Sequence, residues 1–328
     1  MSTRNKKLPS ELVIKAGKFV WTKMWQMMMQ NLAPKGENGA YIRPESQFRN
    51  WIKRQENHIY QPDEQRYHLY VGTGCPWAHR TLVVRAIKGL EATLPITIVK
   101  PAGDRGIWVF SEIERGCQTL PELYNLAKPG YQGRCTVPVL WDNQTQTIVN
   151  NESAEIIIML NSEFNQFAKH PELDLYPEDL RAEIEQWNEK IYHTVNNGVY
   201  RCGFAQTQLA YETAVGELFT TLDEIDKFLK TNAYTYLCGD KITLADVRLF
   251  TTLLRFDVVY YGLFKCNLRR IQDYENLSLY LQNIYELPGV AETCDIEQIK
   301  QDYYGNLFPL NPGGIIPIGP ELKLVSGK

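Results

Sequence analysis

Cys75 is the side chain of this sequence best placed to do chemistry. It follows a predicted strand, Tyr67–Val71, and a short glycine-bearing turn, and Pro76 then opens a predicted helix that runs through Ile87. Proline is favoured at the first helical position, because the N–H that it lacks would have no partner there. We therefore expect Cys75 to cap this helix, beside unpaired N–H groups and the positive end of the helix dipole, which favour the reactive thiolate. The alternative is a cysteine that only caps or packs.

The residues that follow Cys75 narrow the chemistry. The segment Cys75-Pro76-Trp77-Ala78 has the layout of a Cys-x-x-Cys redox motif, but alanine stands where the second cysteine would be. Cys75 therefore has no local thiol that could resolve a disulfide. If Cys75 does redox chemistry, the second thiol must come from outside.

Short strands and helices alternate around Cys75 between about residues 62 and 163. The predicted strands are 67–71, 96–99, 136–141 and 146–149, with helices after Cys75 and near Ser153. The β-branched run at 96–99 suits a parallel partner reached through a βαβ crossover. Residues 101–133 are rich in glycine and are expected to be mostly loop. The order of these elements predicts a thioredoxin-like α/β domain over residues 62–163.

Helical patterns replace the strands beyond residue 177. The predicted helices are 180–200, 207–229, 243–261, 277–286 and 296–304. Thr243 and Asp246 have the spacing of a capping box, with aspartate in place of the preferred glutamate or glutamine. We therefore predict an all-helical domain over residues 177–305, so the fold class is α/β plus all-α. Residues 306–328 form a Pro/Gly-rich tail that is expected to run over the surface.

Residues 1–61 are predicted to form an N-terminal extension or arm. Within it, residues 12–29 are amphipathic, with Lys15, Lys18 and Lys23 among apolar side chains. This pattern fits a membrane-surface helix, a transit peptide, or an arm packed on the body. The scarcity of serine argues against a transit peptide. Residues 43–52 are expected to be an anchored extended piece.

Composition excludes several classes of protein. With 328 residues and 44% hydrophobic content, the chain can bury a large core and divide into two domains. A net charge of −3 argues against nucleic acid as the main ligand, and no apolar run reaches the length of a membrane span. Seven scattered cysteines predict a reducing compartment, the cytoplasm. Neither they nor the five histidines have metal-ligand spacing, so no metal site is expected.

Several long motifs, in order along the chain, resemble the Xi class of glutathione transferases, the glutathionyl-hydroquinone reductases. The motifs are Gly74 to Arg80, Thr136 to Asp142, Asn150 to Ser153, Val195 to Tyr200, Arg255 to Tyr260, Phe264 to Asn267, and the tail segments Asn311-Pro312 and Gly319-Pro320. The resemblance covers about residues 42–320. It implies a thioredoxin-like domain followed by the helical glutathione-transferase domain, and a homodimer. Gly72-Thr73-Gly74 departs from the family, which more often has a Ser-Leu-Ala-like stretch there.

The resemblance also implies a glutathione site. Val137-Pro138 resembles the cis-proline turn of this fold, whose preceding residue can pair with the tripeptide backbone. Glu152 and Ser153, at a helix start, would bind the γ-glutamyl ammonium and carboxylate, although ordinary helix caps look the same. Trp108 resembles the tryptophan that covers glutathione. Arg134 is a further candidate for a carboxylate contact.

The second substrate implied is an aromatic glutathionyl-hydroquinone, bound against the helical domain. Tyrosine rings can stack on it and their hydroxyls can bond its phenolic oxygens. The candidates from the matched motifs are Tyr192, Tyr200, Tyr260 and Tyr303, of which Tyr260 and Tyr303 are also the candidate catalytic residues beside Cys75. Glutathione is then the co-substrate that supplies the missing thiol.

Two other functions remain open from the sequence. An Omega-like thiol transferase acting on dehydroascorbate or mixed disulfides would use the same cysteine with a less aromatic pocket. A non-catalytic glutathione-binding protein is the alternative from a different class. The intact segments Cys75 to Ala78 and Asn151 to Ser153 argue against it.

Overall fold

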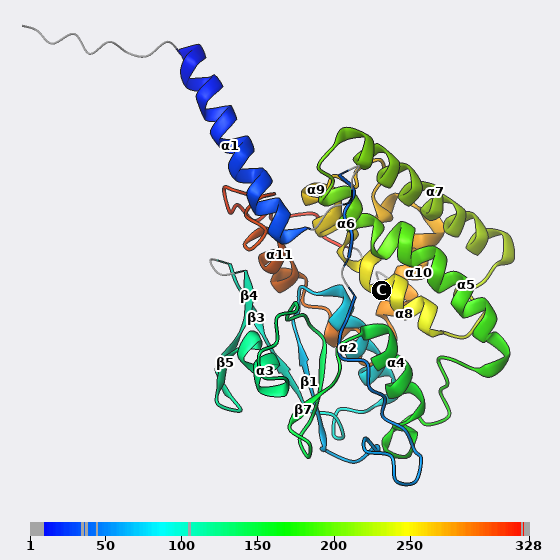
Figure 1. The fold of residues 1–328 in the computed structure, drawn as a ribbon. Coiled ribbons are helices and arrows are strands. Elements are labelled where there is room, and N and C mark those ends of the chain that lie inside the picture. The colour runs from blue at the N-terminus through cyan, green and yellow to red at the C-terminus, as the bar shows by residue number, and fades with distance from the viewer. Residues whose placement is uncertain are drawn as a thin grey trace, which may run out of the picture.

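The structure, a computed structural model, describes residues 10–33, 36, 39–43, 45–103, 106–322 and 324. An α/β part built on a four-stranded sheet lies beside a group of helices (Figure 1). This is the predicted α/β plus all-α arrangement, so the fold class is confirmed. The first nine residues of the predicted arm and the last four of the predicted tail lie outside the described residues.

The four-stranded sheet has the strand order β2-β1-β6-β7. Its strands are β1 (Tyr67–Val71), β2 (Ile96–Ile98), β6 (Val139–Asp142) and β7 (Thr147–Asn150). β1 is parallel to β2 and antiparallel to β6, and β6 is antiparallel to β7. The parallel pair is joined by α2 (Pro76–Lys88), and α4 (Ser153–Ser162) follows β7. This is the βαβ–ββα order that the sequence predicts.

The prediction of loop over residues 101–133 is wrong. The segment holds a second sheet and a helix: β3 (Lys100–Ala102), β4 (Ile107–Glu114), β5 (Cys117–Thr119) and α3 (Leu120–Ala127). Gly106 and Gly116 have φ of +64° and +78° and lie in the turns of the two hairpins. These glycines therefore mark tight turns between strands, because the left-handed region suits glycine best.

The helical part contains more breaks than the sequence indicates. Its α-helices are α5 (Arg181–Ile191), α6 (Gly198–Gly203), α7 (Gln208–Asn232), α8 (Leu244–Arg255), α9 (Tyr261–Leu263), α10 (Glu275–Tyr285) and α11 (Ile296–Tyr304). The short 3-10 helices are η1 (Asn165–Phe167), η2 (Glu178–Leu180), η5 (Ile271–Asp273) and η6 (Ala291–Thr293). The predicted helices 180–200 and 243–261 are interrupted by π-helical turns, η3 (Tyr192–Asn196) and η4 (Phe256–Tyr260). The capping box of Thr243 and Asp246 is confirmed.

Helix α2 joins the two parts of the molecule. It packs on α4 of the α/β part and on α8 of the helical part. Ten of its thirteen residues are buried, including the polar side chains of His79 and Arg80. The first turn of α2, where Cys75 stands, therefore lies at the junction of the two parts.

The N-terminal segment is anchored over only part of its length. Residues 43–52 include an extended piece along β7, where the N–H of Asn50 donates to the carbonyl of Val149 over 3.0 Å, as predicted. α1 (Ser10–Leu32) reaches the body with its C-terminal end, where Met29 is fully buried, and projects away from it with the rest (Figure 1). An arm packed along its whole length is therefore not what the structure shows.

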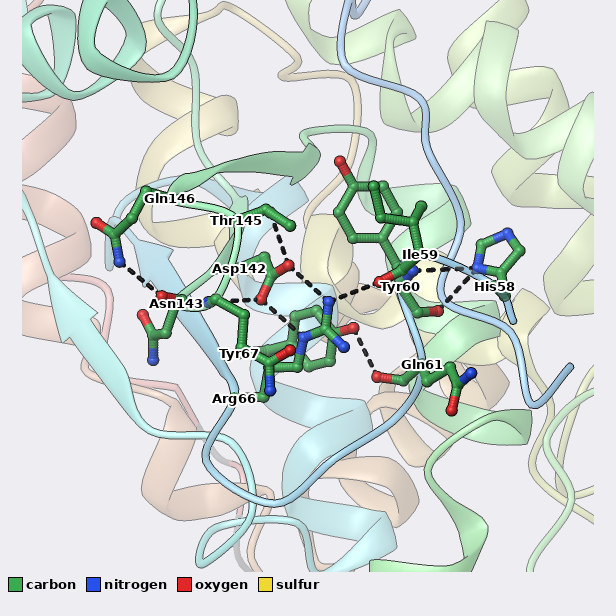
Figure 2. Close-up of polar contacts among 11 residues, drawn as sticks. His58, Ile59, Tyr60, Gln61, Arg66, Tyr67, Asp142, Asn143, Thr145 and Gln146 are labelled. Atoms are coloured by element: carbon green, nitrogen blue, oxygen red, sulfur yellow. Dashed lines mark hydrogen bonds and ion pairs between the residues drawn. The ribbon is translucent and has the colours of Figure 1, made fainter. Parts of the chain in front are cut away.

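A buried ion pair ties the α/β part together at the start of β1. Arg66 donates from Nε and one terminal nitrogen to the two carboxylate oxygens of Asp142, each over 2.8 Å (Figure 2). Asp142 is fully buried, and it also accepts from the hydroxyl of Thr145 over 2.7 Å. Burial alone would raise the pKa of Asp142, but its hydrogen bonds, chiefly from Arg66 and Thr145, hold that pKa below its usual value.

Asp142→Asn should destabilise the fold by about 3 kcal/mol at neutral pH, because it leaves the Arg66 guanidinium without its counter-charge. The folded pKa of Asp142 lies below the unfolded value of about 4. The stabilisation by ionised Asp142 is therefore complete above that pH and is lost as the pH falls through the folded pKa. Urea unfolding of both proteins at several pH values should show a difference in the free energy of unfolding that becomes smaller in acid. Glu224→Gln, in an exposed pair with Lys190, should cost less than about 1 kcal/mol, and an equal cost for both variants would contradict the prediction.

Candidate active site

Cys75 lies where the sequence predicts, as the N-cap of α2. Its backbone is extended, with φ −77° and ψ 114°, and Pro76 occupies the first helical position. Its carbonyl accepts the first helical bond, from the N–H of His79 over 3.0 Å. The thiol Sγ lies 3.6 Å from the carbonyl oxygen of Val137, whose peptide bond to Pro138 is cis.

Two opposing effects set the acidity of Cys75. Burial raises the pKa of the thiol, while the N–H of Ala78 and the positive charges of Arg43 and Arg255 lower it. Burial prevails, and the pKa lies above its ordinary value. The N–H groups at the start of α2 thus lower the pKa of Cys75, as the sequence predicts, while burial acts against them.

The unusual turn before Cys75 is explained by two close approaches. A Cβ on Gly72 would lie 2.5 Å from a ring carbon of Trp108, and a Cβ on Gly74 would lie 2.5 Å from the Cβ of Asp302. Such distances are far below ordinary contact, so neither position admits a side chain unless a neighbour moves. The departure Gly72-Thr73-Gly74 thus fits this chain's own Trp108 and Asp302.

Residues of the helical part hold the same turn. Arg255, at the end of α8 and fully buried, donates to the carbonyls of Thr73 over 2.8 Å and Gly74 over 2.9 Å. Another of its nitrogens lies 3.0 Å from Nδ1 of His79. Asp302 of α11 accepts from the N–H of Gly74 over 2.8 Å. The backbone on the N-terminal side of Cys75 is therefore fixed by two side chains from the other domain.

A cavity of about 260 Å³ opens beside Cys75. Of the predicted site residues, Cys75, Trp108, Arg134, Val137, Tyr200 and Tyr303 line it. Further lining residues that the sequence analysis did not single out include Tyr41, Arg43, Phe204, Asp302 and Asn306. The cavity is thus bounded by the arm, the α/β part and the helical part together.

Tyr260 and Tyr192 do not line this cavity. Tyr260 is fully buried behind Tyr303, and Tyr192 lies against Trp77, with 6.1 Å between ring centroids. The predicted direct contact of these two tyrosines with an aromatic substrate is therefore not supported. Both lie in π-helical turns, η3 and η4, that the sequence does not reveal.

Three tyrosine hydroxyls meet at the cavity wall. The hydroxyl of Tyr303 lies 2.6 Å from that of Tyr200 and 3.0 Å from that of Tyr260. Burial raises the pKa of all three phenols, and that of Tyr260 to about 12. All three are therefore protonated at neutral pH, and Tyr200 and Tyr303, which line the cavity, can donate a proton to a group bound there.

Trp77 gives the cavity an aromatic and cationic side. The guanidinium carbons of Arg43 and Arg80 lie 4.0 Å and 4.4 Å from its ring centroid. The ring of Tyr200 stacks on Trp77 at 6.4 Å with 27° between planes. Because a cation is attracted to an aromatic face, Trp77 holds Arg43 at the cavity. Arg43 lies in the arm, where the sequence indicated only an anchored piece.

Glu152 and Ser153 lie at the N-terminus of α4, outside the cavity wall. The Glu152 carboxylate accepts from the N–H of Ala154 over 3.2 Å and from the hydroxyl of Ser46 over 2.9 Å. It is therefore a helix cap. The Ser153 hydroxyl is buried and has no hydrogen-bond partner within the described part of the chain. A buried hydroxyl of this kind suits a polar ligand group.

Within the residues that the structure describes, no group of three or more His, Cys, Asp or Glu side chains is able to hold a metal ion. Among the described helices, none is long and apolar enough to cross a membrane.

Two family models match this chain. The model of the glutathione S-transferase N-terminal domain covers residues 74–163, and that of the C-terminal domain covers residues 208–283. The fold and the site around Cys75 therefore define a glutathione transferase.

Individual relatives narrow this class. The chain is 42% identical over 312 residues to glutathionyl-hydroquinone reductase PcpF of Sphingobium chlorophenolicum, covering 93% of this chain and 96% of that protein. The crystal structure of glutathione transferase Xi from Phanerochaete chrysosporium is 47% identical, with a TM-score of 0.83 over 87% of this chain and 94% of that one. The glutathione-bound structure of YqjG from Escherichia coli K-12 is 44% identical, with a TM-score of 0.79 over 84% and 94%. The chain belongs to the Xi class of glutathione transferases, the glutathionyl-hydroquinone reductase family.

Proposed function

We propose that this chain reduces glutathionyl-hydroquinones to hydroquinones with glutathione as the reductant. The observation that carries the proposal is one cavity with Cys75 and the hydroxyl-bearing rings of Tyr200 and Tyr303 on its wall. Ala78 at the place of a resolving cysteine supports a glutathione-dependent cycle. The name of the relative PcpF supports the substrate class.

The proposed seat for the glutathionyl group lies between Cys75 and Trp108. The backbone of Val137, next to the cis bond to Pro138, would pair with the cysteinyl part of the tripeptide, because its carbonyl lies 3.6 Å from the Cys75 thiol. Trp108 would cover the tripeptide from β4. The bound glutathione of the YqjG structure supports a glutathione site in this fold.

One charged end of glutathione would be held outside the cavity, because Glu152 and Ser153 lie at the N-terminus of α4 and do not line it. Ser153 would donate its unpaired hydroxyl to the γ-glutamyl carboxylate, and Glu152 would take the ammonium. Arg134, exposed at the edge of the cavity, would bind the other carboxylate. Arg43 also lines the cavity and adds a positive charge that was not predicted from the sequence.

The reaction has two steps in this proposal. The Cys75 thiolate attacks the sulfur of the glutathionyl-hydroquinone, the bond from sulfur to the aromatic carbon breaks, and that carbon takes a proton. The aromatic carbon is thereby reduced, and Cys75 and the glutathionyl sulfur are oxidised to a mixed disulfide. A free glutathione thiolate then attacks the glutathione sulfur of this disulfide, which releases oxidised glutathione and the Cys75 thiolate.

A substrate panel tests the function. The purified chain with glutathione should reduce glutathionyl-hydroquinones. With the glutathionyl-hydroquinone but without free glutathione, intact-mass analysis should show one added glutathione, and peptide mapping should locate it on Cys75. Activity on dehydroascorbate or mixed disulfides without hydroquinone release would instead indicate a thiol transferase. Conjugation of a chlorodinitrobenzene alone would overturn the proposal.

Tyr303→Phe should lower kcat by about 10²-fold with little change in KM, because Tyr303 is the protonated phenol on the cavity wall that supplies the proton. Tyr260→Phe is the matched control. Tyr260 lies behind Tyr303 and should affect kcat much less. Steady-state rates of the two variants decide the point: an undiminished kcat in Tyr303→Phe would remove this residue from the proton path.

The homodimer implied by the resemblance and the cytoplasmic location predicted from the cysteines remain predictions. Sedimentation velocity of the purified chain and imaging of the tagged full chain in cells would check them.

A further inference from the structure

Helix α1 carries an apolar face that the described part of the chain leaves largely exposed. Eight large apolar side chains are exposed by 41% to 68%: Leu12, Val13, Ile14, Phe19, Val20, Trp21, Met24 and Met27. Contact with the body is limited to the C-terminal half, where Met29 is buried and Trp21 meets Phe308 at 6.2 Å between ring centroids. Figure 1 shows the rest of the helix standing away from the body. So many exposed apolar groups in one segment mark an interaction surface.

The residues of α1 divide into two faces. At 3.6 residues per turn, Val13, Val20, Met24 and Met27 lie along one line of the helix. Lys23 lies beside this apolar line, whereas Lys18 and Lys15 lie on the opposite, polar side of the helix. Lys15 pairs there with Glu11 over 2.7 Å. A lysine beside an apolar surface can rest its methylene stem on that surface and keep its charge in a polar layer.

Charge separates this segment from the rest of the chain. Residues 1–23 contain six Lys or Arg and one Glu, a net charge of +5, whereas the whole chain carries −3. The remaining residues therefore carry −8. A basic amphipathic helix on an acidic body is typical of binding to an anionic surface.

We propose that α1 is a membrane-surface anchor that lies in the interface of an anionic bilayer. The apolar line would enter the boundary between headgroups and acyl chains, with Lys18 and Lys23 at the anionic headgroups. Two copies of α1 packed face to face would instead bring together two segments that each carry a net charge of +5. The charge of the segment therefore favours an anionic lipid surface over a second α1.

Flotation of the full chain with vesicles of equal parts phosphatidylcholine and phosphatidylserine tests the proposal. The chain should float with these vesicles, and a smaller fraction of it should float at high salt. With vesicles of phosphatidylcholine alone, it should remain in the bottom fraction. K18E/K23E should bind at least roughly 25-fold more weakly, since each of the two lysines contributes about a factor of five. V13Q/V20Q/M27Q removes apolar area without changing charge and should also lose binding.

Matched controls separate this effect from net charge. K53E/K227E makes the same charge change at two exposed lysines outside α1 and should bind as the unmodified chain does. Equal loss in both lysine variants, or no flotation of the unmodified chain, would overturn the proposal. So would a V13Q/V20Q/M27Q variant that still floats. A drop in oligomer size for that variant in vesicle-free sedimentation, with no vesicle binding by the unmodified chain, would assign the face to self-association. None of these measurements uses turnover, so they are independent of the proposed function.

Discussion

Cys75→Ser should abolish the reduction of glutathionyl-hydroquinones, with a fall in kcat/KM on the order of 10⁴-fold or more, as for loss of a covalent nucleophile. Serine keeps the size and the cap position of Cys75, but a hydroxyl cannot form a mixed disulfide. Hydroquinone release, followed by chromatography, measures the loss. Intact-mass analysis of the same variant should show no bound glutathione.

Cys135→Ser is the matched control for this variant. Cys135 is half-buried and lies between Arg134 and Thr136, both on the cavity wall, but its own side chain does not line the cavity. Its loss should leave turnover largely intact. Full turnover in Cys75→Ser would refute the covalent mechanism, and equal loss in both variants would show that the thiols act together.

Local sequence suffices for the position of Cys75. The strand, the turn and Pro76 are contiguous, so the N-cap position follows from residues within one helical turn. The acidity of the thiol does not follow in this way. It depends on how deeply the folded chain buries Cys75, and burial is set by residues far along the sequence.

The residues that hold the turn before Cys75 cannot be predicted from the sequence either, because they too lie far along the chain. Arg255 bonds to Gly74 across 181 residues, and Asp302 bonds to it across 228. Neither carries a local signal. Arg255 stands in a family motif, but the motif gives no partner for its side chain.

The tyrosines show a second limit. Tyr260 and Tyr303 looked equivalent in sequence, and the structure sets Tyr303 on the cavity and Tyr260 behind it. The choice depends on how α11 packs against the π-helical turn η4, a break that no periodicity revealed. Residues 101–133 show a third limit: the glycines indicate the turns, but β3 and β5 are three residues each, too short to give a clear alternating pattern.

Arg255→Met should lower kcat/KM by about 10²-fold and make Cys75 less acidic. Methionine keeps much of the length of the arginine but donates nothing to the carbonyls of Thr73 and Gly74, so the turn before Cys75 loses its support. Arg255 is also one of the positive charges that lower the pKa of Cys75 against the effect of burial. Its removal therefore moves the thiolate to higher pH, and the pH profile of iodoacetamide alkylation at Cys75 should shift in that direction.

Two further variants separate charge from geometry. Arg255→Lys keeps a positive charge but cannot donate to both carbonyls as the guanidinium does. Its alkylation profile should therefore stay close to that of the unmodified chain, while its kcat/KM falls. Arg248→Met removes another arginine of α8 that does not contact the turn, and it should leave the profile unchanged. If Arg255→Met lowers the melting temperature but leaves both the profile and kcat/KM as they were, Arg255 supports the fold alone. A shift with turnover intact would show instead that its charge acts on Cys75 while other contacts hold the turn.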